Sequence, residues 1–157
     1  MTGPRVPVAI ALGSNLGDRE GHMGFAVERL RPHLAGLRSS TFVETAPEGV
    51  PDIQPSFLNG VVVGDADLSP RALLDLLLDL ERQRGRERAH RYAARTLDLD
   101  LVLYGDLVID EPGLVVPHPR FRERRFVLAP LAEVAGEWVD PVTSLTISAL
   151  LRRLGPS

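Results

Sequence analysis

An alternating segment of leucine and aspartate constrains the fold of this chain most strongly. It runs from Leu97 to Leu103, within the sequence YAARTLDLDLVLYG. Alternation with a period of two is typical of a β-strand, where side chains at i and i+2 point to the same face. The pattern predicts an apolar face made of four leucines, from Leu97 to Leu103. Asp98, Asp100 and Val102 are expected to share the opposite face.

The acidic face has two interpretations. Two steps of about 3.3 Å place the Cα atoms of Asp98 and Asp100 roughly 6.6 Å apart on one face of the strand. Carboxylate oxygens suit hard cations, so the pair can bind one divalent ion or two close ones. The alternative is an edge strand with a solvated acidic face. The D-x-D pattern alone does not decide between them.

Composition excludes several kinds of site. The 157 residues, 44% of them hydrophobic, suit a single domain over residues 1–157 with one core. The sequence contains no cysteine and no lysine, which excludes disulfides, cysteine nucleophiles, cysteine-based zinc sites and P-loop lysines. No apolar run approaches the roughly 20 residues that span a bilayer, and the N-terminus lacks a signal-peptide pattern. We therefore expect a cytoplasmic monomer with no membrane partner.

Arginines cluster around the acidic strand. The net charge of −3 gives no general electrostatic reason to bind nucleic acid. Ten of the 18 arginines nevertheless lie between Arg82 and Arg125, on both sides of Asp98 and Asp100. A solvated surface charge is the simplest interpretation of any one of them. That interpretation does not explain the clustering.

The expected order of elements is β-α-β-β-α-β, followed by a hairpin and helices. Asp18 and Ser69 are the expected N-caps of the two main helices, and Gly85 is expected to end the second. This order suits a ferredoxin-like α+β fold, with helices on one face of an antiparallel sheet and the other face free for the acids. Strands are expected at 6–12, 37–48, from 57 and at 97–103, helices at 18–34, 69–85, 121–138 and 144–155, and the hairpin at 105–120.

Six segments of the sequence stand in a distinctive order and at distinctive spacings. They are ALGSNLGDRE, ETAPEG, SFLNGVVV, LERQRGRER, RYAARTLDLDLVLYG and VPHPRFRERRFVLAPLAEVA. Together they resemble the family of 6-hydroxymethyl-7,8-dihydropterin pyrophosphokinases of folate synthesis, over nearly the whole chain. The resemblance implies transfer of pyrophosphate from ATP to the hydroxymethyl group of the pterin, with two Mg²⁺ ions and release of AMP.

The resemblance also implies roles for individual residues. Planar guanidinium groups suit phosphate oxygens, two aromatic rings suit a flat heterocycle, and an amide suits the edge of a pterin. For each phenylalanine, core packing is the alternative. The implied catalytic residues are Arg86, Arg95, Asp98 and Asp100, the last two also as metal ligands; the ATP-binding residues are Glu81, Arg88, Arg91, His118 and Arg124; the pterin-binding residues are Thr45, Ala46, Phe57, Asn59 and Phe126.

Residues 86–95 are implied to form a lid over the nucleotide. Tyr92-Ala93-Ala94 stands there where the family usually has Trp-Gly-Pro. Leu78 stands where glutamine is common, and Pro119 where some members have an aromatic residue. Two other functions stay open. An RNA-binding module would need aromatic side chains on the sheet face, where this chain carries acids. A pseudoenzyme that binds ATP without transfer is disfavoured by the intact D-x-D.

Overall fold

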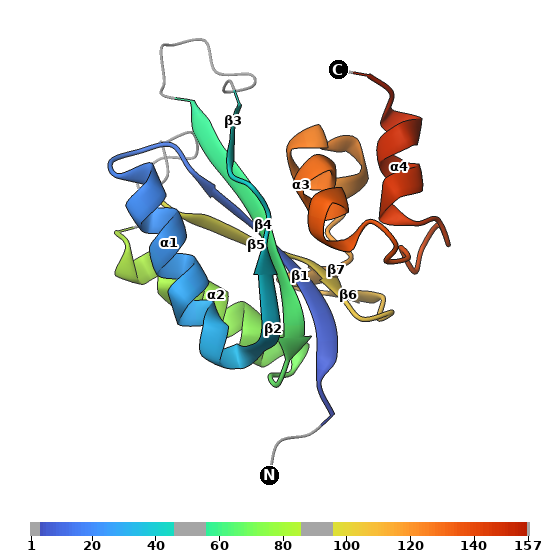
Figure 1. Ribbon diagram of the computed structural model, residues 1–157. Coiled ribbons are helices and arrows are strands. Elements are labelled where there is room, and N and C mark those ends of the chain that lie inside the picture. Colours follow the sequence, from blue (N-terminus) through green and yellow to red (C-terminus); the bar gives the residue numbers. More distant parts are fainter. Residues whose placement is uncertain (1–3, 46–55, 86–95, 157) are drawn as a thin grey trace.

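The computed structural model describes residues 4–45, 56–85 and 96–156 and is a mixed α and β structure built on an antiparallel sheet (Figure 1). The strands are β1 (Val6–Ser14), β2 (Leu34–Ser39), β3 (Val43–Thr45), β4 (Phe57–Ala66), β5 (Asp98–Tyr104), β6 (Ile109–Glu111) and β7 (Leu114–Val116). The helices are α1 (Arg19–Leu30), α2 (Pro70–Gln83), α3 (Arg125–Ala135) and α4 (Ile147–Leu154), with 3₁₀ turns η1 (Arg31–His33) and η2 (Phe121–Glu123).

The main sheet has the strand order β2-β4-β1-β5, and β3 extends the pairing along β4 beyond the end of β2. All of its pairings are antiparallel. The predicted hairpin is confirmed as a separate two-stranded sheet of β6 and β7. Strand β5 is an edge strand of the main sheet. Asp98 and Asp100, near its start, therefore lie beside one neighbouring strand, β1.

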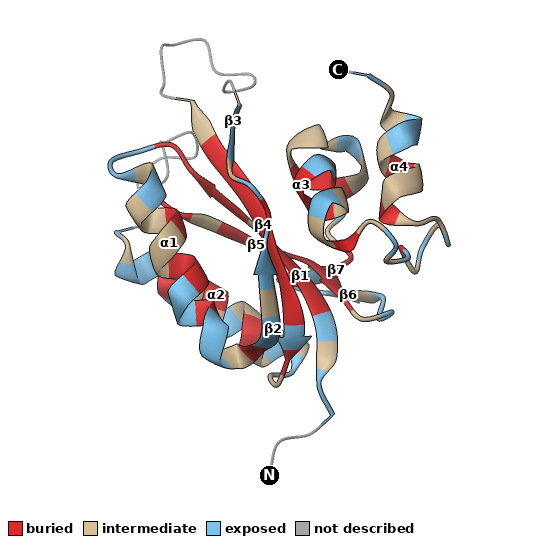
Figure 2. Cartoon of the chain, viewed as in Figure 1, coloured by how far each residue is buried: buried red, intermediate tan, exposed pale blue. Residues whose placement is uncertain are grey.

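Helices α1 and α2 cover one face of the sheet, as predicted. Asp18 and Ser69 cap them, since each side chain accepts a hydrogen bond from the backbone N–H three residues later. Gly85 follows α2 with φ +85°, a backbone conformation that ends helices and favours glycine. Figure 2 shows the inward sides of both helices buried. They enclose a core with leucines of the sheet, among them Leu12 and Leu99.

The first helix is shorter than predicted. The α-helix ends at Leu30, and Pro32 lies in the 3₁₀ turn that follows, because proline cannot donate the backbone hydrogen bond that would continue the helix. Strand β2 then begins at Leu34, which the sequence pattern places in the helix. The single strand predicted over 37–48 is two strands in the described residues, β2 and β3, both paired with β4.

The opposite face of the sheet is not free, and that expectation is wrong. Helices α3 and α4 cover much of it and form a second core with Val61 and Val63 of β4. The run of three valines at 61–63 explains this, because a strand buried on both faces needs apolar side chains on both. Asp98 and Asp100 are only partly buried. The end of this face that carries them is therefore accessible.

A β-bulge changes the faces of β5. Ile10 of β1 pairs with Leu101, whereas Ala9 pairs with Leu103, so Val102 is an extra residue. Leu103 consequently joins the α3 and α4 core, and the prediction that it shares a face with Leu97 is wrong. The acids precede the bulge and keep their predicted face. Among the described residues, no helix has the length and apolar character needed to cross a membrane.

Candidate active site

One row of the sheet joins residues implied in binding the metal and the pterin. Gly13 of β1 pairs with Asp98 on one side and with Asn59 on the other. Directly paired residues of antiparallel strands point to the same face, which here is the face of α3. A Cβ atom at Gly13 would lie 3.3 Å from the amide oxygen of Asn59. Glycine therefore leaves open the surface between the carboxylate and the amide, about 10 Å apart across two strand spacings.

Asp100 lies on the same face, two residues along β5, where it pairs with Ala11. The two partly buried carboxylates supply hard oxygen ligands, which suit Mg²⁺. Within the described part of the chain, no group of three or more histidine, cysteine or acidic side chains could hold a metal ion on its own. Asp98 and Asp100 thus fit a cation whose other ligands are water and phosphate oxygens, as is usual for Mg²⁺ bound with a nucleotide.

Glu81 supports the acidic strand from the helix side. It lies at the end of α2 with 1% of its surface exposed, and its Oε2 accepts a hydrogen bond of 2.7 Å from the backbone N–H of Leu99. Leu99 lies between Asp98 and Asp100. This hydrogen bond therefore holds the backbone of β5 in place at the position of the two acids. The structure does not bring Glu81 to the accessible face. Its role in binding ATP stays a prediction.

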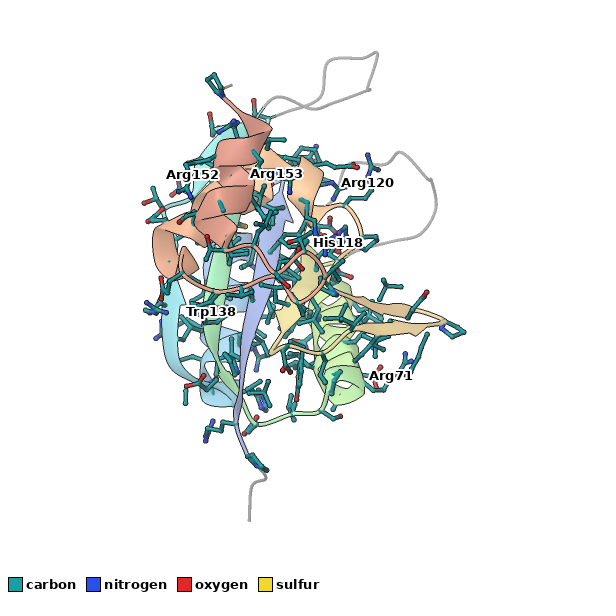
Figure 3. The ribbon with its side chains drawn as sticks, turned by 90° about the vertical axis from the view of Figure 1, so that its right-hand side faces the viewer. Arg71, His118, Arg120, Trp138, Arg152 and Arg153 are labelled. Carbon is teal, nitrogen blue, oxygen red and sulfur yellow. The ribbon has the colours of Figure 1, made fainter. Side chains whose placement is uncertain are left out.

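The loop after β7 brings His118 to the acidic strand. The N–H of His118 donates to the carbonyl of Val102 at 3.0 Å, and its Nδ1 accepts from the backbone N–H of Arg120 at 3.1 Å. Figure 3 shows His118 and Arg120 close together in this loop. The pKa of His118 is lowered, first by burial and then by the positive charge of Arg124, although Asp98 acts in the opposite direction. His118 and Arg124 therefore lie within electrostatic reach of Asp98.

Arg124 and Phe126 lie at the start of α3. The guanidinium carbon of Arg124 is 5.6 Å from the centre of the Phe126 ring, within the range of a cation–π interaction. Phe126 is partly buried against the second core. A predicted phosphate ligand and a predicted pterin ligand are thus neighbours on one helix end.

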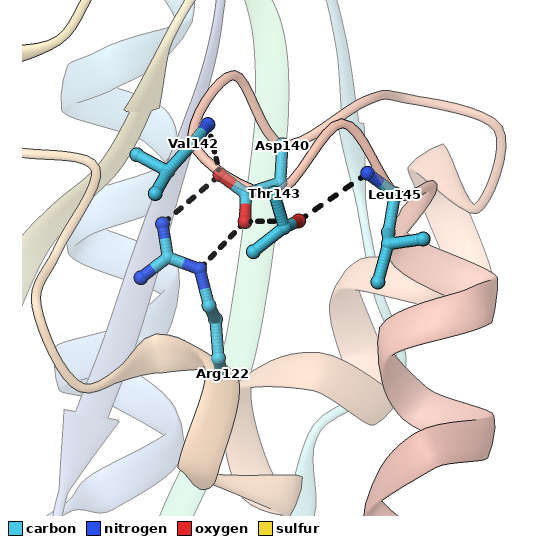
Figure 4. Close-up of polar contacts among 5 residues, drawn as sticks. All are labelled: Arg122, Asp140, Val142, Thr143 and Leu145. Atoms are coloured by element: carbon cyan, nitrogen blue, oxygen red, sulfur yellow. Dashed lines mark hydrogen bonds and ion pairs between the residues drawn. The ribbon is translucent and has the colours of Figure 1, made fainter.

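A buried ion pair holds the turn that carries these residues (Figure 4). Asp140 is fully buried and accepts hydrogen bonds from Nε of Arg122 at 2.5 Å and from a terminal nitrogen of Arg122 at 3.0 Å. The N–H of Val142 and the hydroxyl of Thr143 donate to the same carboxylate. Arg122 belongs to η2, the 3₁₀ turn that directly precedes Arg124. Sequence reasoning missed this pair, because 18 residues separate its members and no spacing rule connects them.

The predicted pterin residues meet at the ends of β3 and β4. Thr45 pairs with Phe57, and the amide nitrogen of Asn59 donates to Oγ1 of Thr45 at 2.6 Å. Phe57, Asn59 and Val61 alternate along β4, so their side chains point to the face that α3 covers. Gly13 adjoins them, since a Cβ there would lie 4.0 Å from the Phe57 ring. The structure brings Thr45, Phe57 and Asn59 together on the same face as the acids, with β1 between them and the acidic strand.

Several implied residues lie outside the described residues: Ala46, Arg86, Arg88, Arg91 and Arg95, together with the Tyr92-Ala93-Ala94 replacement. The residues that flank 86–95 are described. Oγ1 of Thr96 donates to the carbonyl of Arg84 at 2.6 Å, and the Arg84 guanidinium stacks on Phe25 and donates to Nδ1 of His22. The start of β5 is thereby fastened to the end of α2.

Comparisons with known proteins identify the family of this chain. Residues 9–136 match the family 7,8-dihydro-6-hydroxymethylpterin-pyrophosphokinase (HPPK). The chain is 39% identical to a 2-amino-4-hydroxy-6-hydroxymethyldihydropteridine pyrophosphokinase from Synechocystis, over 92% of this chain and 74% of that protein. It is 44% identical to the protein of the same name from Bacillus subtilis, over 86% of this chain and 81% of that protein.

Some relatives are longer proteins. The chain is 45% identical to a mitochondrial folate synthesis bifunctional protein of Arabidopsis thaliana, of which it covers 24%. The crystal structure of Plasmodium falciparum HPPK-DHPS has the same fold, with a TM-score of 0.77 at 13% identity, over 95% of this chain and 44% of that one. Since the family match and the bacterial relatives each extend over most of the sequence, the chain belongs to the 7,8-dihydro-6-hydroxymethylpterin-pyrophosphokinase family.

Proposed function

We propose that this chain transfers a pyrophosphoryl group from ATP to the hydroxymethyl oxygen of 6-hydroxymethyl-7,8-dihydropterin, with release of AMP. The observation that carries the proposal is the row formed by Asp98, Gly13 and Asn59. It has a metal-binding carboxylate at one end and an amide suited to the pterin at the other. Such a row can hold the two reactants beside each other, which removes much of the entropic cost of their encounter.

ATP would bind at the β5 end of the row. Arg124 and the neutral imidazole of His118 are suited to phosphate and ribose oxygens, and both lie near Asp98. Asp98 and Asp100 would hold Mg²⁺, two ions being implied by the resemblance, and bound Mg²⁺ would neutralise charge on the phosphates and polarise the transferred group. Arg86, Arg88, Arg91 and Arg95 are proposed to complete the phosphate contacts, with Arg86 and Arg95 acting mainly on the transition state.

The pterin would bind at the β4 end. Phe57 and Phe126 are proposed to stack on the two faces of the ring, and Asn59 to bind its amide edge with Thr45 and the backbone near Ala46. In the reaction, the hydroxymethyl oxygen forms a bond to the β-phosphorus of ATP. The bond from that phosphorus to the oxygen shared with the α-phosphorus breaks, AMP leaves with that oxygen, and the hydroxyl proton is released.

The wider predictions belong to the same proposal. The strand order β2-β4-β1-β5, with α1 and α2 on one face, supports a ferredoxin-like arrangement. A cytoplasmic location and a monomeric state stay predictions from the sequence.

An assay of AMP formation tests the proposed reaction. The purified chain is incubated with ATP, Mg²⁺ and the hydroxymethyl pterin, and AMP is measured in a coupled assay. We expect AMP to form only when the pterin is present. A reaction without pterin is the control for plain ATP hydrolysis.

Two results would favour the other functions. Tight binding of ATP in a titration, with no AMP formed at any pterin concentration, would indicate a pseudoenzyme. Retention of single-stranded RNA in a filter-binding assay, without measurable ATP binding, would indicate an RNA-binding module. The partial cover of the sheet face by α3 and α4 disfavours the latter, because an open aromatic face is what such modules use.

A further inference from the structure

Arg19, the first residue of α1, bridges two strands that end at the proposed pterin site. One terminal nitrogen of its guanidinium donates to the backbone carbonyl of Ser56 at 2.8 Å. The other forms an ion pair with the carboxylate of Glu44 in β3. The side chain of Arg19 is 28% exposed and that of Glu44 is 59% exposed, so the ion pair lies at the surface.

Both partners of Arg19 are direct neighbours of proposed pterin ligands. Glu44 precedes Thr45, and Ser56 precedes Phe57. Thr45 and Phe57 are paired across the two strands. One guanidinium therefore joins the two chain segments at the position where these two ligands face each other.

Arg19 acts from behind the sheet. Successive side chains of a strand point to opposite faces, so Glu44 points away from the face that Thr45 occupies. Arg19 belongs to α1, which covers the face opposite to that of α3. Thr45 and Phe57 are directed to the face of α3. Its contacts thus fix the backbone beneath the ligands without placing Arg19 against the pterin.

Strand β3 has few contacts of its own to hold it. It has three residues and pairs with β4 only, at the edge of the sheet. An edge strand of this length has few ladder hydrogen bonds, so a charged contact from a neighbouring helix adds substantially to its definition. Arginine suits this task because its planar fork can donate to two separate acceptors, whereas lysine carries a single ammonium.

We infer that Arg19 is a positioning residue for pterin binding, which holds Thr45 and Phe57 in register through Glu44 and the Ser56 carbonyl. The inference rests on the proposed function, since it takes Thr45 and Phe57 as pterin ligands. An exposed ion pair contributes little to overall stability. The loss of Arg19 is therefore expected to affect the pterin site more than the fold.

The experiment compares Arg19→Ala, Arg19→Lys and Glu44→Ala with a matched control, Arg31→Ala. Arg31 forms an exposed ion pair with Glu28, close to the other end of α1 and away from β3. The KM values for pterin and ATP, kcat and the melting temperature are measured for each variant. Binding of the pterin to the enzyme with a non-hydrolysable ATP analogue is measured by calorimetry.

For Arg19→Ala we expect the pterin KM and Kd to rise about fivefold, because one ion pair and one hydrogen bond to a charged donor are lost. The ATP KM and kcat should stay within about twofold, and the melting temperature should match that of the control. Arg19→Lys should lie between Arg19→Ala and the parent protein. Glu44→Ala should raise the pterin KM less than Arg19→Ala, since the contact with Ser56 remains, and a double variant should be no worse than Arg19→Ala.

Pterin constants unchanged in Arg19→Ala would overturn the inference. So would an equal rise in both KM values together with a lower melting temperature, which is the pattern of a purely structural residue. If the parent protein forms no AMP, the proposed reaction fails, and calorimetry still tests the role of Arg19 in pterin binding. If the parent protein binds no pterin, the inference fails with it.

Discussion

The carboxylate of Asp140 accepts two hydrogen bonds from the guanidinium of Arg122, and Asp140 has no exposed surface. Removing one member of such a pair leaves the other charge uncompensated in a poorly solvated place. We expect Arg122→Ala to lower the free energy of unfolding by about 3 kcal/mol, measured by urea denaturation. The control is Glu111→Ala, which removes the exposed ion pair with Arg71 and should cost less than about 1 kcal/mol. Equal losses in the two variants would contradict the prediction.

The same pair predicts a dependence of stability on pH. Burial acts to raise the pKa of Asp140, but hydrogen bonds from Arg122, the N–H of Val142 and Thr143 outweigh it, and the pKa lies below its ordinary value of 3.8. A carboxyl group with a lowered pKa stabilises the folded state above its unfolded pKa, and this contribution is lost as the pH falls through the folded pKa. Asp140→Asn should therefore melt below the parent protein at pH 7, and the gap should narrow below about pH 4. A constant gap from pH 7 to pH 2.5 would disprove this.

Local features of the fold could be predicted from the sequence. Asp18 and Ser69 cap helices because their side chains accept hydrogen bonds from N–H groups three residues away, which makes the signal readable within one turn. The faces of Asp98 and Asp100 follow from the period of a strand. Thr45, Phe57 and Asn59 came from the family resemblance, and the structure brings them together.

Features of the fold that depend on tertiary contacts could not be predicted from the sequence. The bulge at Val102 leaves no mark in an alternating sequence, since Leu103 suits either core. The second core could have been suspected from the three valines at 61–63, which exceed the needs of a strand with one buried face. The partners of Arg19 and Arg122 are distant in sequence, and any arginine can form an ion pair. Such contacts depend on the assembled fold.

Asp98→Asn or Asp100→Asn is expected to abolish AMP formation with little change in melting temperature. Each substitution keeps the shape of the side chain and removes one of two neighbouring negative charges that would hold Mg²⁺. The measurement is turnover at saturating Mg²⁺, with Asp106→Asn, in the exposed turn after β5, as the control. Near-normal turnover by either site variant would rule out joint metal binding.

Phe57→Ala and Phe126→Ala are each expected to weaken pterin binding by about 1 to 3 kcal/mol, through lost stacking and burial. ATP affinity should change little, because the rings are proposed to contact the pterin only. Calorimetric titrations with each ligand separate the two effects. A comparable fall in both affinities would show that the rings act as core residues.

Arg95→Ala is expected to lower kcat by roughly 10²-fold or more, while ATP affinity shifts far less. An arginine that acts mainly on the transition state contributes to turnover rather than to ground-state binding. Arg86→Ala should have a smaller effect, which makes it the matched comparison. Single-turnover kinetics and ATP titrations give both quantities, and a variant that loses affinity but keeps its kcat would refute the transition-state role.

The extra residue in β5 bears on how this protein can change in length. If Val102 were deleted, every remaining side chain of β5 would keep its present face, because Leu101, Leu103 and Tyr104 would then alternate regularly. The pairing of β5 with β1 does not need this residue, although its side chain is buried in the second core. The carbonyl of Val102, however, accepts the N–H of His118. The extra residue therefore provides a hydrogen-bonding anchor for the loop that carries His118, and a shortened strand would keep its pairing with β1 while leaving that loop without this contact.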